Sequence, residues 1–228
     1  MAVIEGGVTA ALQEIESATL AGRSTQRPSD VGARGAYSFG QSTGVIAAGL
    51  GANSEIFQFR WSHATLIAVP RSVRISAAVS TTAFIAGVPP QLELRVARGW
   101  TGQGTGGTGI TFGVNDGKKR SNFAQSAMAA GDLRIATTAA LGAGTKTLDG
   151  FAVASLSGNG GVATGTTQMF PPGTYLWERN TGDEWPFVFL QNQGFVIRSV
   201  EIPGTGTWKL AAIIEWSEYD PAVITGWT

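Results

Sequence analysis

The stretch GFVIRSVEIPGTGTWKLAAIIEW, residues 194–216, decides the fold class. Apolar and polar residues alternate on both sides of its centre, which is the two-residue period of a β-strand with one buried face. Trp208 and Trp216 share one face with the apolar residues at every second position between them. The centre, EIPGTG, holds proline and glycine, which favour turns. The stretch therefore predicts two strands, 194–200 and 207–216, joined as a β-hairpin.

The same period recurs upstream in EIFQFRW (55–61), RSVRISAAV (71–79) and QLELRVA (91–97). Each places apolar side chains on one face and polar or charged ones on the other, as in antiparallel sheets that expose one face to solvent. Further segments have strand composition and bring the expected total to about eight to ten strands. They are DLRIAT (132–137), GFAVASL (150–156), GTYLWER (173–179) and PFVFLQ (186–191).

These strands are separated by Gly, Pro and Asn, and no helical segment is long enough for a βαβ crossover. The pattern predicts an all-β fold, an antiparallel β-sandwich that is jelly-roll-like. Two connections, around 98–131 and 157–172, are unusually long. Loops of that length are usually binding surfaces or disordered segments.

The N-terminal part has a different pattern. VTAALQEIESATL, residues 8–20, has helical periodicity, and Gly22 follows it. The next residues, rich in Arg, Gly and polar breakers, have no sustained period. We therefore expect an arm with one short helix over residues 1–40 and a β-sandwich domain over 41–228.

Composition restricts the function. With 228 residues the chain can bury a substantial core. It has no cysteine, which excludes disulfides and thiolate metal sites. Sixteen basic residues balance sixteen acidic ones, so nucleic acid is an unexpected partner, and no apolar run or signal pattern predicts a membrane span or secretion. Only 14% of residues are charged, while 7 Trp and 11 Phe are present, which favours extensive protein contacts.

One motif suggests a nucleotide site. GTGGTG, residues 104–109, matches the G-x-G-x-x-G spacing of a dinucleotide-binding loop. That loop works only where the third glycine opens a helix whose amides receive the pyrophosphate. The following ITFGVNDG alternates like a strand and ends in a turn, so we interpret the stretch as a flexible loop between strands and expect no cofactor.

Catalytic and metal-binding sets are also poorly supported. The sole histidine, His63, is expected to be half-buried and hydrogen-bonded, and one histidine without cysteine argues against a transition-metal site. The paired carboxylates Asp183 with Glu184, and Glu215 with Glu218 and Asp220, could serve glycoside hydrolysis. Nothing indicates that any of them lies in an apolar pocket. We therefore expect no enzyme.

Several residues are candidates for contacts with a partner. Lys118, Lys119 and Arg120 form a basic turn that fails the spacing of a phosphate-binding loop. The expected arm adds three arginines. Trp100 lies beside the glycine-rich loop and is the tryptophan that burial in the core explains least well. The candidate contact residues are Arg23, Arg27, Arg34, Trp100, Lys118, Lys119 and Arg120.

The region around residues 130–220, and more loosely back to residue 30, resembles a group of bacteriophage virion proteins. Members share a strand of the form D-I/L-R-I-A, a turn leading to T-L-D, a closing G-F-V/I-I/V-R and a terminal strand ending in E-W or D-W-x-E. Here these elements are residues 132–136, 147–149, 194–198 and 215–218. The resemblance implies a capsid decoration, cement or minor capsid protein, and it carries no catalytic residues.

The expected function is therefore non-enzymatic: binding and stabilising an assembled phage capsid, on the virion surface, after synthesis in the host cytoplasm. Its partners would be the major capsid protein and further copies of itself, with a homotrimer expected from capsid symmetry alone. The alternative is a head-fibre or tail adhesin in which Trp100, Trp177 or Trp185 stacks on host-surface carbohydrate. A hydrolase would require two of the carboxylates to face each other in a cleft.

Overall fold

The computed structural model describes residues 4–6, 11–13, 33–47, 50, 53–84, 89–159, 168–179, 186–202 and 204–221. The chain forms two compact units, residues 1–31 and 32–228. In the first unit, β1 (Ile4–Gly6) pairs antiparallel with β2 (Ala11–Gln13). The helix expected over 8–20 is not confirmed, because 11–13 is a strand and its other positions lie outside the described residues.

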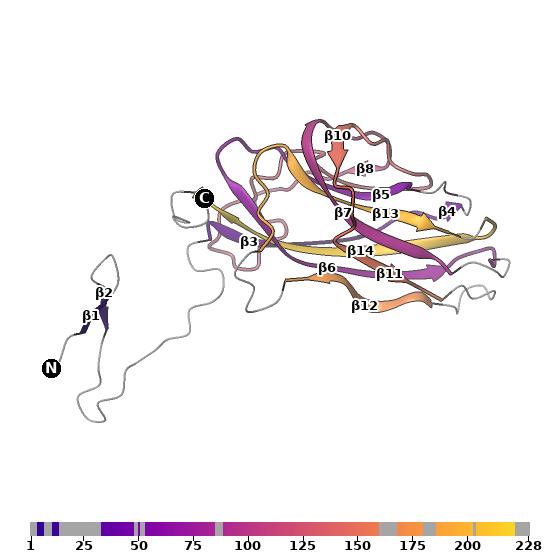
Figure 1. Ribbon diagram of the computed structural model, residues 1–228, viewed down its shortest axis with the longest axis horizontal. Coiled ribbons are helices and arrows are strands. Elements are labelled where there is room, and N and C mark those ends of the chain that lie inside the picture. The colour runs from indigo at the N-terminus through magenta and orange to yellow at the C-terminus, as the bar shows by residue number, and fades with distance from the viewer. Residues whose placement is uncertain are drawn as a thin grey trace, which may run out of the picture. The chain divides into compact units, whose positions relative to one another are not determined.

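The second unit consists of two antiparallel sheets (Figure 1). The first sheet has the order β12-β6-β14-β3, and β4 also pairs with β14. The second sheet has the order β10-β7-β13-β5-β9-β8, and β11 also pairs with β7. The strands are β3 (Gly35–Ser42), β4 (Ile46–Ala47), β5 (Glu55–Trp61), β6 (Ile67–Val79), β7 (Gln91–Gly102), β8 (Thr108–Gly109), β9 (Leu133–Ile135), β10 (Thr145–Leu148), β11 (Ala154–Ser157), β12 (Gln168–Glu178), β13 (Gln193–Glu201) and β14 (Thr207–Tyr219).

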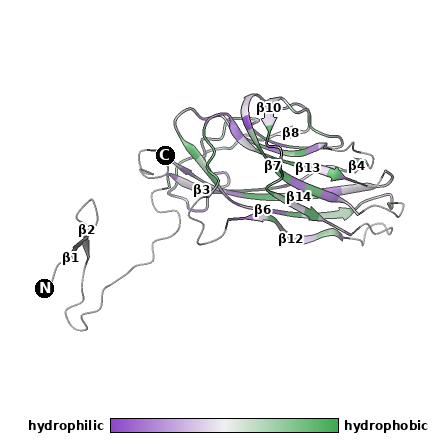
Figure 2. Cartoon of the chain, viewed as in Figure 1, coloured by the Kyte–Doolittle hydropathy of each residue, from purple (hydrophilic) through white to green (hydrophobic). Residues whose placement is uncertain are grey.

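The two sheets pack face to face through an aromatic core. Phe59 of β5 stacks on Phe195 of β13 with ring centroids 5.1 Å apart, and it makes a T-shaped contact with Trp216 of β14 at a centroid distance of 5.5 Å. Tyr37 of β3 stacks on the same tryptophan. Apolar segments of the strands are distributed over both sheets in Figure 2. The all-β, sandwich-like fold expected from the two-residue period is therefore confirmed.

The predicted hairpin over 194–216 is wrong, although both of its strands exist. β13 lies between β5 and β7 in the second sheet, whereas β14 lies between β6 and β3 in the first. The EIPGTG segment therefore connects one sheet to the other. Alternation identifies a strand and the face that it turns to the core. It does not reveal whether two successive strands pair within one sheet or lie in opposite sheets, because both arrangements turn the same side chains to the core.

The boundary of the expected arm also needs correction. β3, residues 35–42, pairs with β14 along its whole length, so it belongs to the sandwich and not to an arm that ends at residue 40. Gly40 and Ser42 occupy this strand and weaken its apolar period, which hid it in the sequence. The strand expected over 186–191 reduces to one bridge between Phe189 and Ala68.

Hydrogen bonds tie the connection around 98–131 to the neighbouring strands. β7 continues to Gly102, and β8, which includes the last glycine of GTGGTG, pairs with β9. Gly107 has a φ of 56°, and a Cβ there would collide with the Ile135 carbonyl oxygen. The glycines thus allow close backbone approach, and no helix follows them. Residues 160–167 of the other long connection lie outside the described part.

We predict that Phe59→Ala lowers the free energy of unfolding by about 3–5 kcal/mol, because it removes a fully buried ring that joins both sheets. Urea unfolding followed by tryptophan fluorescence measures the change. Val114→Ala, at a side chain that is 65% exposed, is the control and should change the stability by less than about 0.5 kcal/mol. Equal effects at the two positions would contradict this account of the core.

Candidate functional site

The basic turn holds the free edge of the first sheet. The Lys119 amide donates to the Ala36 carbonyl and the Ser38 amide donates to the Gly117 carbonyl, so the turn covers β3. The Lys119 ammonium lies 2.8 Å from Glu215. Arg120 is exposed and lies over the Phe123 ring. The three predicted basic residues are thus adjacent, but Lys119 has a structural ion pair.

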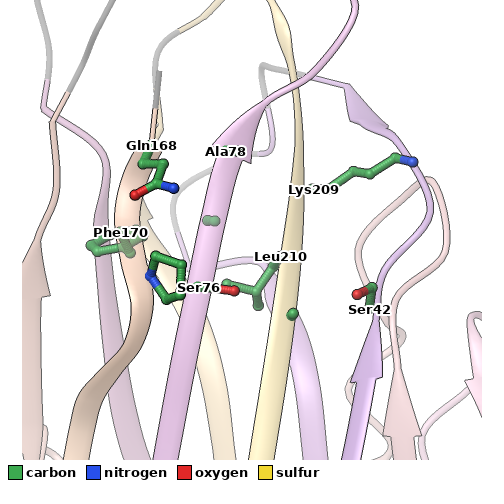
Figure 3. A pocket seen from close by; sticks show the side chains of 10 residues that line it. Ser42, Ser76, Ala78, Gln168, Phe170, Lys209 and Leu210 are labelled. Atoms are coloured by element: carbon green, nitrogen blue, oxygen red, sulfur yellow. The ribbon is translucent and has the colours of Figure 1, made fainter. Parts of the chain in front are cut away.

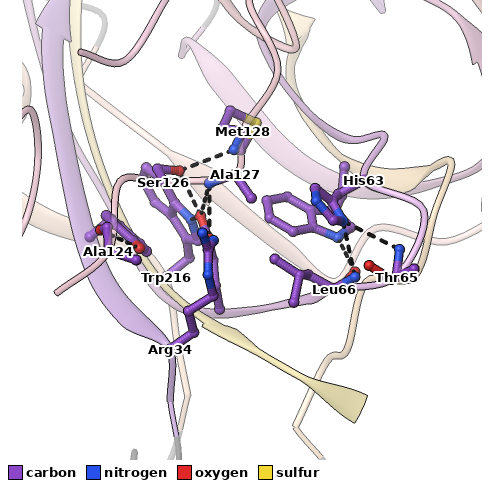
Figure 4. A network of polar contacts seen from close by, with 12 residues as sticks. Arg34, His63, Thr65, Leu66, Ala124, Ser126, Ala127, Met128 and Trp216 are labelled. Atoms are coloured by element: carbon purple, nitrogen blue, oxygen red, sulfur yellow. Dashed lines mark hydrogen bonds and ion pairs between the residues drawn. The ribbon is translucent and has the colours of Figure 1, made fainter. Parts of the chain in front are cut away.

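Arg34 belongs to a network around the fully buried carboxylate of Glu218 (Figure 4). Glu218 accepts hydrogen bonds from the Ser126 hydroxyl, the Ala127 amide and the Trp216 indole, and its second oxygen lies 3.3 Å from Arg34. The buried carboxylate therefore ties the loop around residue 126 to the last strand. Arg34 contributes to this structural network, with 38% of its side chain exposed.

Tyr37 lies beside the same network. Its hydroxyl donates to the Ala124 carbonyl at 2.9 Å. Burial raises the pKa of Tyr37 to about 12; the charge of Glu218 adds to this and Arg34 partly opposes it.

Trp100 is buried, so its expected role as an exposed contact is wrong. It is 1% exposed and packs with Ala97, Val196 and Leu148 on the outer face of the second sheet, separate from the main core. The Lys146 ammonium lies 4.3 Å from the centre of its ring. The loops after β7 and before β10 are joined by hydrogen bonds between Thr105 and Gly142. The strand pattern of the sequence does not reveal such contacts between distant residues.

Buried ion pairs continue across the outer face of the second sheet. Arg60 lies 3.0 Å from Asp132, which also accepts from Gln103 at 2.9 Å. Arg95 and Arg198 both contact Glu93. Several of the chain's charged residues therefore form ion pairs and hydrogen bonds that attach loops to strands. The sequence did not reveal these contacts.

Burial alone would raise the pKa of the Glu93 carboxyl, but hydrogen bonds and charges from Arg95 and Arg198 outweigh it and hold the pKa below its ordinary value. Burial also opposes ionisation of Glu215, but Lys119 and Arg74 likewise lower the pKa of that carboxyl. Neither group is suited to act as a general acid near neutral pH. The site for glycoside hydrolysis is therefore not supported at Glu215.

The other residues considered for catalysis or glycan stacking either make structural contacts, are exposed, or lie outside the described residues. His63 Nδ1 accepts the amide hydrogens of Thr65 and Leu66, which closes a turn next to Trp61. Trp177 packs against Phe187. Glu218 is enclosed as described, and Asp220 is exposed. Outside the described residues lie Arg23, Arg27, Asp183, Glu184 and Trp185.

The most exposed large apolar side chain in the described part of the chain is Phe151, which was not predicted as a contact. It is 89% exposed at the tip of the loop between β10 and β11. The loop is held on both sides of the ring. The Asp149 amide donates to the Val96 carbonyl and the Val153 amide to the Leu94 carbonyl, at 2.9 and 2.8 Å.

Two arginines of β7 hold the same loop from beneath. Arg95 donates to the carbonyls of Asp149 and Gly150, and Arg98 makes two hydrogen bonds to the Asp149 carboxylate. The backbone next to Phe151 is thus fixed while its ring remains in solvent. An exposed aromatic ring on a backbone held by hydrogen bonds suits a protein interface, because little backbone entropy is lost when it binds.

A hollow of about 260 Å³ lies on the first sheet (Figure 3). The small residues Ser76, Ala78 and Ala211 line it, with Gln168 on β12 at one side and Lys209 on β14 at the other. It is a shallow depression whose lining is more apolar than polar, since Ala77, Phe170, Pro172 and Leu210 also line it.

Among the described residues, no group of three or more His, Asp or Glu side chains could hold a metal ion. In the same part of the chain, no helix has the length and apolar character needed to cross a membrane. The chain matches no protein-family model, no curated protein and no solved structure.

We predict that one of the three tyrosines ionises only at about pH 12 and that Tyr37→Phe removes this component. The pKa of Tyr37 in the folded protein lies above the ordinary value of 10.0, so the folded protein binds this proton more tightly than the unfolded chain does. The contribution of this group to the free energy of unfolding is therefore complete below about pH 10 and is lost as the pH rises towards about 12. Ultraviolet absorbance of the phenolate measures the titration. A late component that persists in the variant would contradict the assignment.

We predict that Glu93→Gln destabilises the protein most above about pH 4.5 and that its difference from wild type shrinks as the pH falls. The folded pKa is lowered, so the stability from this carboxylate is present above the unfolded value and disappears as the pH falls through the folded value. Urea unfolding at several pH values measures it. The exposed Glu178→Gln is the control and should show a small difference at every pH.

Proposed function

We propose that this chain is a non-enzymatic structural protein of a bacteriophage virion that binds and stabilises the assembled capsid as a decoration or cement protein. Its partner would be the major capsid protein at the virion surface, after synthesis in the host cytoplasm. Further copies of the chain would join it, with a homotrimer as the working arrangement because local threefold positions suit such proteins.

The strand order supports a finer fold, the jelly roll. β3 pairs with β14, β5 with β13, β6 with β12, and β7 with β10 and β11. Apart from the two-residue β4, which also pairs with β14, the first strand of the sandwich thus pairs with the last, the next with the one before it, and so on inwards. A long antiparallel hairpin rolled into two sheets has this order, and jelly rolls occur in viral capsid and lectin domains.

The observation that carries the functional proposal is the exposed ring of Phe151 on a loop whose backbone is held by hydrogen bonds. A protein that attaches to a finished shell must bind without refolding, so it needs a preorganised apolar contact. The buried ion pairs also support capsid decoration, because charged residues that pair inside the protein leave a surface with few charges for contacts with another protein. The resemblance of residues 130–220 to phage virion proteins adds to this support.

We predict that Phe151→Ser weakens binding to undecorated phage heads by about 30-fold or more, the loss expected for a central aromatic contact. Co-sedimentation of purified protein with empty heads measures the affinity, and resistance of the heads to heat measures stabilisation. Leu190→Ser, at another exposed apolar side chain, is the matched control and should bind like wild type. If the wild type binds saturably and Phe151→Ser binds equally well, Phe151 is not part of the contact. If the wild type does not bind the heads, the decoration function is rejected.

The second candidate is a carbohydrate-binding adhesin, and the hollow on the first sheet favours it. Ser42, Ser76, Gln168 and Lys209 offer hydroxyl, amide and amine groups of the kind that bind sugar hydroxyls. The burial of Trp100 removes the aromatic platform expected there. Binding on a glycan array that Lys209→Ala and Gln168→Ala abolish would favour this function over decoration.

A further inference from the structure

Three polar side chains meet in a buried cluster on the outer face of the second sheet. They are Glu55 and Gln58 of β5 and Lys146 of β10, whose side chains are almost completely enclosed. The Lys146 ammonium lies 2.8 Å from Glu55 Oε2, and Gln58 Nε2 donates to the same oxygen at 2.6 Å. The two nitrogens are therefore no farther apart than 5.4 Å, the sum of these two distances.

The surroundings fix the orientation of all three groups. Gln58 Nε2 also donates to the Gly142 carbonyl at 3.0 Å, and Lys146 donates to the neighbouring Ala143 carbonyl. Gln58 Oε1 occupies the space that a side chain at position 104 would need, which explains the glycine there. The Trp100 ring covers the lysine nitrogen. An amine, a carboxamide and a carboxylate are thus held together away from bulk water.

This arrangement favours acyl transfer. Burial lowers the pKa of the Lys146 ammonium, although Glu55 opposes the change, so the neutral and nucleophilic amine forms more readily than in water. Glu55 Oε2 contacts both nitrogens and can take a proton from the attacking one and deliver a proton to the leaving one. Fixing the reactants next to each other replaces an unfavourable bimolecular encounter.

We propose that Lys146 and Gln58 become joined by an intramolecular amide bond, with Glu55 as the proton carrier. The lysine Nζ attacks the glutamine Cδ, a new C–N bond forms, and the bond from Cδ to Nε2 breaks. Glu55 moves one proton from Nζ to Nε2, which leaves as ammonia. The reaction is an exchange of one amide for another and needs no oxidant or cofactor.

The product would act as a disulfide does in other proteins. It would connect β5 in the middle of the second sheet to β10 at its edge and close a large loop of chain. Closing a long loop reduces the entropy of the unfolded chain and so stabilises the folded one. A chain without cysteine can gain a covalent cross-link in this way, and the bond does not depend on the redox conditions.

The test is the intact mass of the purified full-length protein, followed over time above neutral pH. We expect the mass to fall below the sequence mass by one ammonia, and tandem mass spectrometry to find one branched peptide that contains both Lys146 and Gln58. A mass that stays at the sequence value overturns the proposal. Loss of one water, with a branch between Lys146 and Glu55, also overturns it, since the carboxylate would then be the acyl donor.

Two variants assign the roles. Lys146→Arg keeps a buried cation but removes the amine, and we expect it to keep its full sequence mass. Glu55→Gln keeps the size of the side chain but removes the proton carrier, and we expect ammonia loss to slow at least tenfold. A wild-type rate of ammonia loss in Lys146→Arg would overturn the assignment to this lysine. The wild-type mass decides the proposal even where a variant fails to fold.

Discussion

The contact between Phe59 and Trp216 is the one on which the rest of the structure depends. It joins the middle of the second sheet to the middle of the first, and the aromatic rings of both sheets pack around it. Phe112 from the long connection after β7 also meets Trp216, with ring centroids 5.5 Å apart. The same aromatic core therefore sets the separation of the sheets and holds a loop that has little regular structure of its own.

The sparse charges complement this core. Buried pairs such as Arg60 with Asp132 and Lys146 with Glu55 hold loops on the outer face of the second sheet, and Glu218 holds another loop at the end of β14. A buried ion pair is weak evidence of net stability, but removing one partner leaves an uncompensated charge, so such pairs define where a loop lies. Charge here specifies loop positions, and apolar packing supplies the main driving force.

The sandwich has two candidate binding surfaces of different chemistry. The loop that carries Phe151 is rigid and apolar at its tip, which suits contact with another protein. The hollow on the first sheet is shallow and combines a mostly apolar lining with the polar side chains of Ser42, Ser76, Gln168 and Lys209. Their different chemistry is what separates the proposed decoration of a capsid from carbohydrate binding. The jelly roll proposed from the strand order would fit both, because jelly rolls serve in capsids and in lectins.

The sequence by itself determined that the protein is all-β and which face of the main strands packs into the core between the sheets, because apolar side chains recur there at every second position. Residues 55–61 match the bounds of β5, but its other face, which carries Gln58, is buried as well and only the structure showed this. Only the tertiary structure decided which strands pair. It placed β13 and β14 in different sheets, added β3 to the sandwich, and buried Trp100 beneath Lys146. Pairing, loop cover and ion pairs join residues far apart in the chain, and a local pattern carries no information about such contacts.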